Sequence, residues 1–97
     1  MAVFAVLYTY DERSSDRDVH RPAHRAFLAD LEAEGVLLAA GAYSDDGDPG
    51  ALLIVRGDTS AEVTAVLAKD PFVLAGLVPD IDIREWSAGF GPWSGKA

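Results

Sequence analysis

The sequence contains no cysteine, and only 8 of its 97 residues are lysine or arginine. The absence of cysteine excludes disulfides, thiolate nucleophiles and zinc–cysteine sites. The 16 aspartates and glutamates give a net charge of −8, and no basic patch with interleaved aromatic residues is present. Because such a charge repels a phosphate backbone, we expect neither nucleic acid nor an anionic membrane surface as a partner.

Long hydrophobic runs are also missing. The apolar stretch Ala2–Leu7 follows no basic leader and is too short for a signal-peptide core or a membrane span. We therefore expect a cytoplasmic protein that does not contact a membrane. Lysine is scarcer than arginine, and alanine is abundant, which indicates a bacterial source with GC-rich DNA.

The chain length predicts one small domain, which would bury roughly 65% of its unfolded surface on folding. The hydrophobic fraction is 49% and the mean hydropathy is +0.10, both generous for so short a chain. We therefore expect part of the apolar surface to lie between two copies in a homodimer.

The hydrophobic patterns predict four strands and two main helices. The expected order is strand 2–10, a helix ending near residue 34, strands 36–43 and 51–57, helix 61–68, a helical turn within 70–77, and strand 78–86. Ser15, Asp16 and Asp18 are the candidate N-caps of the first helix, which would place Pro22 in its first turn. Ser60 is the candidate N-cap of the second helix.

This order, β-α-β-β-α-β, predicts an α+β fold of the ferredoxin-like class. Its four-stranded antiparallel sheet carries both helices on one face, and the continuously apolar first strand should be central. The other face would be bare unless it stacks against a second sheet. Residues 88–97 follow the last strand as a glycine-containing tail with two large aromatic residues, Phe90 and Trp93.

Two histidines lie four residues apart at the start of the first helix. Phe27, Leu28 and Leu31 follow His24 at the spacing of an apolar helix face, so the His24 side chain should point inward. Such a histidine is a metal ligand, a catalytic base, or a core residue with its hydrogen bonds satisfied. His20 and His24 could face one zinc ion, but the helix supplies no third ligand, so we expect no metal.

Two glycine-containing loops invite ligand interpretations that their spacing does not support. Residues 44–50, with three aspartates, lack the alternating ligands and the distal glutamate of a calcium loop, and a hairpin turn explains them. Residues 89–95 precede no helix, as a phosphate-binding loop would require. No cofactor is therefore expected.

Asp70 precedes Pro71, which is the arrangement of a helix N-cap followed by the first helical residue. In the expected topology Asp70 can also come close to His24. A carboxylate bonded to one imidazole nitrogen fixes the tautomer and raises the basicity of the other nitrogen. The sequence leaves both interpretations open.

Three segments together resemble the YCII-related family, whose members are small bacterial proteins. These segments are 21–41 (RPAHRAFLADLEAEGVLLAAG), 70–77 (DPFVLAGL) and 83–86 (IREW). The resemblance covers residues 1–87 and implies a ferredoxin-like fold that dimerises as an α+β barrel. It also implies an active-site pair at His24 and Asp70, and one branch of the family resembles a dehydrochlorinase of chlorinated hydroxyhydroquinones.

Two functions are therefore considered. The first is a cofactor-independent lyase or isomerase for a small aromatic or enol-like metabolite, with His24 as general acid/base and Asp70 as its orienting partner. Arg21 and Tyr8 are its candidate substrate-binding residues, although Arg21 could be a surface ion-pair partner and Tyr8 a strand aromatic. The second is a dimeric module that binds a small molecule or a protein and uses the His24–Asp70 pair only structurally.

Overall fold

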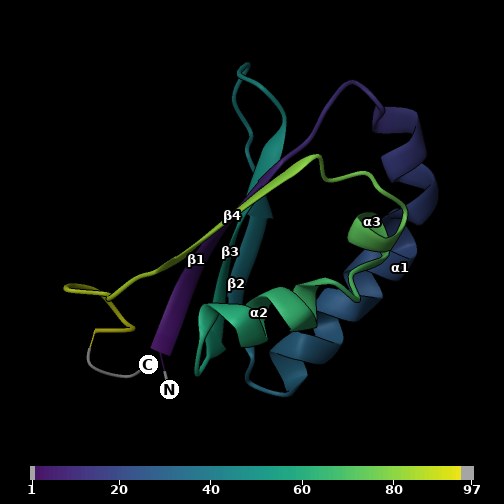
Figure 1. Ribbon diagram of the computed structural model, residues 1–97. Coiled ribbons are helices and arrows are strands. Elements are labelled where there is room, and N and C mark those ends of the chain that lie inside the picture. The colour runs from purple at the N-terminus through teal and green to yellow at the C-terminus, as the bar shows by residue number, and fades with distance from the viewer. Residues whose placement is uncertain (1, 95–97) are drawn as a thin grey trace.

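A computed structural model describes residues 2–94 (Figure 1). Within them, four strands form one sheet in the order β2-β3-β1-β4, and every neighbouring pair is antiparallel. The strands are β1 (Ala2–Thr9), β2 (Leu37–Ala42), β3 (Gly50–Gly57) and β4 (Asp80–Glu85). The prediction that the first strand is central is confirmed, because β1 lies between β3 and β4.

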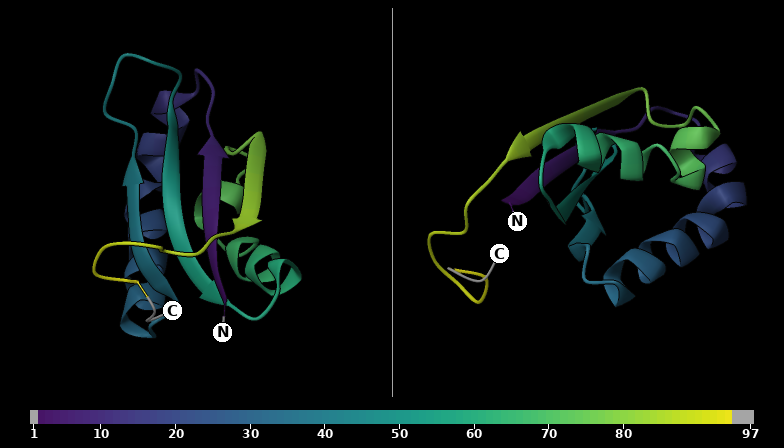
Figure 2. Two further views of the ribbon diagram at one scale, coloured as in Figure 1. Left: turned by 90° about the vertical axis from the view of Figure 1, so that its left-hand side faces the viewer. Right: turned by 60° about the horizontal axis from the view of Figure 1, so that its bottom comes forward.

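The helices gather on one side of the sheet (Figures 1 and 2). They are α1 (Ser14–Ala33), α2 (Ser60–Leu67) and α3 (Pro71–Leu74). The described residues therefore form an α+β fold with a four-stranded antiparallel sheet and three helices. The predicted helical turn after Asp70 is α3, and α2 is capped by Thr59 rather than by Ser60.

The prediction for the start of the first helix was wrong. Helix α1 begins at Ser14, so Pro22 lies inside it, and its N-cap residue is Arg13, which makes no side-chain cap bond. The Asp11 carboxylate instead accepts the Arg13 backbone N–H at 3.0 Å. The early turn also buries Arg17, whose guanidinium donates to the Asp11 carbonyl at 2.8 Å. Arg13 also donates to the Gly76 carbonyl at 2.9 Å, and a tertiary contact of this kind overrides local capping preferences.

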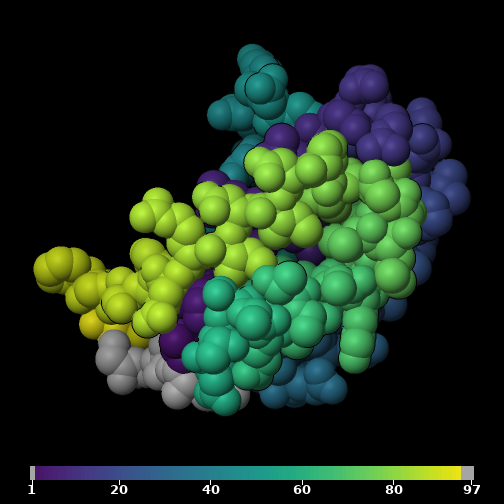
Figure 3. Space-filling view, viewed as in Figure 1, coloured from purple at the N-terminus to yellow at the C-terminus, as the bar shows by residue number. Residues whose placement is uncertain are grey.

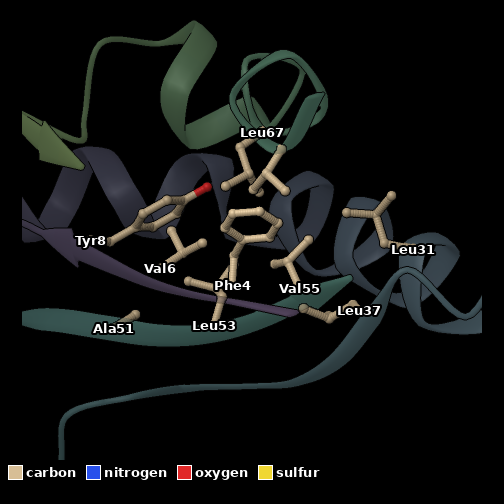
Figure 4. Packing of buried hydrophobic residues seen from close by; sticks show 10 residues of the cluster. Phe4, Val6, Tyr8, Leu31, Leu37, Ala51, Leu53, Val55 and Leu67 are labelled. Carbon is tan, nitrogen blue, oxygen red and sulfur yellow. The ribbon is translucent and has the colours of Figure 1, made fainter. Parts of the chain in front are cut away.

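The core lies between the sheet and the helices, as Figure 4 shows. Alternate residues of β1 point into it, and Phe4, Val6 and Tyr8 are each at most 2% exposed. Val55 and Leu53 of β3 are their cross-strand neighbours, opposite Phe4 and Val6. The same register places Leu7 opposite Leu52 on the other face of the sheet, where these leucines are 37% and 40% exposed.

Residues 86–94, which follow β4, leave the body of the molecule (Figure 3). They cross the side of the sheet that carries no helix (Figure 2), and they extend beyond the main body in the space-filling view (Figure 3). Phe90 is 98% exposed in this segment. Of the predicted tail at 88–97, residues 95–97 lie outside the described part of the chain. Among the described helices, none is long and apolar enough to cross a membrane.

Candidate active site

His24 lies on the inner face of α1 and is 8% exposed. This confirms the orientation predicted from its spacing to Leu31. The imidazole stacks on the ring of Phe72 with 3.8 Å between centroids and an interplanar angle of 3°. Since Phe72 is itself fully buried, it holds the plane of the imidazole in a fixed orientation.

Asp70 combines the two roles that the sequence left open. It is the N-cap of α3, where its Oδ1 atom accepts the backbone N–H of Phe72 at 2.9 Å. The same oxygen lies 2.7 Å from Nδ1 of His24. The other oxygen, Oδ2, accepts the hydroxyl hydrogen of Tyr8 at 2.8 Å. Asp70 is 0% exposed, so these three groups replace the water that a carboxylate would otherwise bind.

This set of contacts fixes which nitrogen of His24 carries a hydrogen. The carboxylate can only accept, so Nδ1 of His24 is the donor in the 2.7 Å contact. In the neutral imidazole, Nε2 then keeps its lone pair and is the basic atom. The arrangement can therefore take up and return a proton at Nε2.

Tyr8 does not occupy the substrate-binding position expected of it. Its side chain is 1% exposed, and its hydroxyl points from β1 toward the helices (Figure 4) and donates to Asp70. Burial and the adjacent Asp70 charge raise the pKa of the Tyr8 hydroxyl far above its ordinary value. Tyr8 thus stays protonated and donates its hydrogen bond to the Asp70 carboxylate from the side of the sheet.

A cleft of about 470 Å³ opens between α1 and the β2 side of the sheet, and His24 is part of its wall. Small residues of the strands, among them Ala40, Gly41 and Ala51, form one side of the cleft. The α1 side of the cleft is mixed, because Arg21 and Arg25 line it together with Leu28 and Ala29. This volume is within the range of small-molecule sites.

Arg21 lines the same cleft as His24, and it also makes the surface ion pair that the sequence offered as the alternative to substrate binding. Its guanidinium makes an ion pair with Asp18 at 3.1 Å and lies 5.7 Å above the ring of Phe72. The contact to Asp18 is exposed, and exposed ion pairs contribute little stability. A bound anion could therefore compete with Asp18 for this guanidinium.

The sequence analysis missed three residues of this site: Tyr10, Arg25 and Phe72. Tyr10 lies two residues after Tyr8, and this spacing was the available signal, because alternate strand residues share a face. Burial and, to a lesser extent, the Asp70 charge raise the pKa of Tyr10 to about 12, although Arg17 and Arg21 partly oppose this rise. Within residues 2–94, no cluster of three or more metal-binding side chains is found, so His20 and His24 have no third ligand there.

Two solved structures are similar to this chain in fold. The crystal structure of an antibiotic biosynthesis monooxygenase has a TM-score of 0.56 and is 16% identical, covering 91% of this chain and 98% of its own; it shows the fold alone. A second solved structure has a TM-score of 0.78 and is 25% identical, covering 90% of this chain and 95% of its own. It is 5-chloro-2-hydroxyhydroquinone dehydrochlorinase (TftG) from Burkholderia phenoliruptrix AC1100, in complex with 2,5-dihydroxybenzoquinone.

Sequence comparison then defines the family. The model of the YCII-related domain matches residues 2–87. The proteins named YciI from Escherichia coli O6:H1 and Shigella flexneri are each 34% identical over 95 residues, covering 88% of this chain and 97% of theirs. The chain belongs to the YCII-related family, as predicted from segments 21–41, 70–77 and 83–86.

Proposed function

We propose that this protein is a small enzyme that catalyses proton transfer, with His24 as general acid/base and Asp70 as its orienting partner. The contact of 2.7 Å between Nδ1 and Oδ1 is the observation that supports it most directly, because it leaves Nε2 as the base on an open cleft. Elimination and isomerisation both begin with such a proton abstraction, which an imidazole and a carboxylate can carry out themselves.

The proposed substrate is a small planar phenol or enol. The alanine- and glycine-rich side of the cleft leaves room for a flat ring, and Arg21 and Arg25 supply positive charge in a protein of net charge −8. The similarity to TftG, a dehydrochlorinase of 5-chloro-2-hydroxyhydroquinone, supports the same class. We propose Arg21 as the group that binds an anionic oxygen of the ring.

The test compares the two histidines of the chain. Chloride release from 5-chloro-2-hydroxyhydroquinone is measured with the wild type, His24→Gln and His20→Gln. We expect His24→Gln to lower kcat about 100-fold or more, the usual contribution of a general base, while His20→Gln stays near the wild-type rate. Equal rates for wild type and His24→Gln would contradict the proposal. If that substrate is not turned over, deuterium exchange into the ring of 2,5-dihydroxybenzoquinone measures proton abstraction directly.

A second candidate is a binding module in which the pair is only structural. The complete enclosure of Asp70, which also caps α3, favours it. In that case His24→Gln and Asp70→Asn would destabilise the fold but leave ligand binding unchanged. A thermal-shift screen of small phenols, lactones and carboxylates identifies a ligand. Proton exchange on that ligand then separates the two functions, because a binding module would bind it without catalysing exchange, whereas an enzyme would catalyse exchange that His24→Gln abolishes.

We also propose that two copies form a homodimer by stacking the sheet faces that carry no helix. The partly exposed Leu7 and Leu52 lie on that face, and Trp86 begins the segment that crosses it. Burying this apolar surface between two sheets would complete the small core. Residues 88–97 would then form a tail separate from the domain, and because its described part crosses this face (Figure 2), that part would lie within the interface.

A further inference from the structure

Tyr8 lies in β1, Tyr10 follows the last residue of that strand, and their ring centroids are 6.2 Å apart, yet their hydroxyl groups have different surroundings. The hydroxyl of Tyr8 donates to Asp70. Tyr10 lines the cleft, and among the described residues no hydrogen bond to its hydroxyl is found. Its backbone is tied down, because its N–H donates to the Pro49 carbonyl at 3.0 Å. A fixed residue therefore presents an unused donor beside the proposed base.

The ring of Tyr10 is held by three neighbours. It meets Phe72 edge-on at 5.8 Å and 86°, and Tyr8 at 6.2 Å and 61°. The guanidinium of Arg17 lies 4.7 Å from the ring centroid. Arg17 is itself 6% exposed and bonded to the Asp11 carbonyl, so it does not move freely. These contacts preorganise the hydroxyl before a ligand binds.

Phe72 also connects Tyr10 to the base. Its ring stacks on His24 at 3.8 Å and contacts Tyr10 at 5.8 Å, so both cleft-lining groups pack around one aromatic side chain. A flat ligand that presents a ring atom to Nε2 of His24 would lie within the same part of the cleft as the Tyr10 hydroxyl. The two groups can therefore act on one ring.

We propose that the Tyr10 hydroxyl binds the substrate oxygen on which negative charge develops when His24 removes a proton. This inference rests on the proposed function and adds a specific contact to it. The proton passes from the sp3 carbon next to a ring carbonyl, in the keto tautomer of the substrate, to Nε2; the electron pair of the broken C–H bond forms the new ring C=C bond, and the π pair of the carbonyl moves onto its oxygen as the enolate charge. Tyr10 keeps its own proton throughout and donates a hydrogen bond to that oxygen.

The environment of Tyr10 suits a donor rather than a base. Its burial and the negative charge of Asp70 raise its pKa to about 12, so it holds its proton at neutral pH. Arg17 on its ring face and Arg21 on the cleft add positive charge nearby. An oxyanion bound there would meet one neutral donor and a cation, which is the usual composition of an oxyanion site.

The three tyrosines of this chain provide a matched experiment. Each is changed to phenylalanine, which removes one hydroxyl and keeps the ring, and the Kd of 2,5-dihydroxybenzoquinone is measured by isothermal titration. Tyr43 lies outside the cleft lining and is 45% exposed, so Tyr43→Phe is the control. We expect Tyr10→Phe to weaken binding about tenfold or more, the loss of one hydrogen bond to a charged group, and Tyr43→Phe to bind as the wild type does.

The outcomes separate this inference from the proposed function. Wild-type affinity in Tyr10→Phe, with a native circular dichroism spectrum, would overturn the role of Tyr10. Failure of the wild type itself to bind the probe at millimolar concentration would overturn it as well. His24→Gln should still bind the probe within a few-fold of the wild type while losing proton exchange, so a failure of catalysis would be visible without any change at Tyr10.

Discussion

Polar side chains are buried and hydrogen-bonded on one face of the sheet and exposed to solvent on the other. Beneath the helices, Asp70 is 0% exposed and each of its contacts comes from a different element: β1, α1 and the first turn of α3. On the other face, Asp80 and Asp82 of β4 stand in solvent, and leucines are left partly uncovered. Burial makes the hydrogen bonds of a polar side chain important for stability and fixes its orientation for chemistry. On the open face, substitutions should change stability little unless a second surface covers that face.

The largest effect should come from Asp70→Ala. This change removes a buried carboxylate and leaves Tyr8, His24 and the Phe72 N–H without their acceptor. We expect a loss of about 3–5 kcal/mol in the free energy of unfolding, measured by urea titration. Asp70→Asn keeps the volume and one acceptor oxygen, so it should lose less. A loss below about 1 kcal/mol in Asp70→Ala would show that the buried contacts do not stabilise the fold.

Tyr8→Phe should have the next largest effect. It removes one hydrogen bond to a buried charged group, which contributes about 1.5–3 kcal/mol. Tyr10→Phe loses no such bond within the described structure and should change stability by at most about 0.5 kcal/mol. Urea titration of both variants measures the difference. Equal losses would mean that the two hydroxyls have the same surroundings, contrary to the structure.

Alkaline pH should lower the free energy of unfolding through the two tyrosines on the helix-covered side of the sheet. The pKa values of Tyr8 and Tyr10 are raised on folding, the latter to about 12, so the folded protein holds these protons longer than the unfolded chain does. Both contributions are complete below about pH 10 and fall by about 1.4 kcal/mol per pH unit above it; that of Tyr10 is lost by about pH 12, and that of Tyr8 continues to fall at higher pH.

Urea titrations at several pH values above 9 measure this slope. The double variant Tyr8→Phe/Tyr10→Phe removes both groups and should flatten the dependence, whereas Tyr43→Phe should leave it unchanged. A slope that survives in the double variant would have to arise from other groups.

The smallest effect on the fold should come from the open face. Leu52→Glu changes a residue that is 40% exposed, so the stability of the single chain should shift by about 0.5 kcal/mol or less. If two copies stack through this face, the same change should convert a dimer into a monomer in sedimentation velocity. Leu74→Glu, at a leucine of α3 that is 72% exposed, is the control. A wild type that sediments as a monomer at micromolar concentration would contradict the proposed dimer.

Local sequence was sufficient for much of the fold. Alternation in β4 predicted half-buried Ile81 and Ile83 beside exposed acids, and helical spacing predicted that His24 points inward. The Asp-Pro pair predicted the cap of α3. The start of α1 could not be predicted in this way, because the packing of Arg13, its N-cap residue, against the Gly76 carbonyl joins segments that are far apart in the sequence. Capping preferences are weaker than such packing.

By itself, the sequence determined the order of the elements, their buried faces and the presence of an imidazole and a carboxylate suited to form a pair. These properties follow from short-range periodicity and from the chemistry of single residues. Only the tertiary structure decided which groups meet. Tyr8 and Tyr10 have the same chemistry and point to the same side of β1, and the position of α3 above the sheet determines that one supports Asp70 while the other lines the cleft.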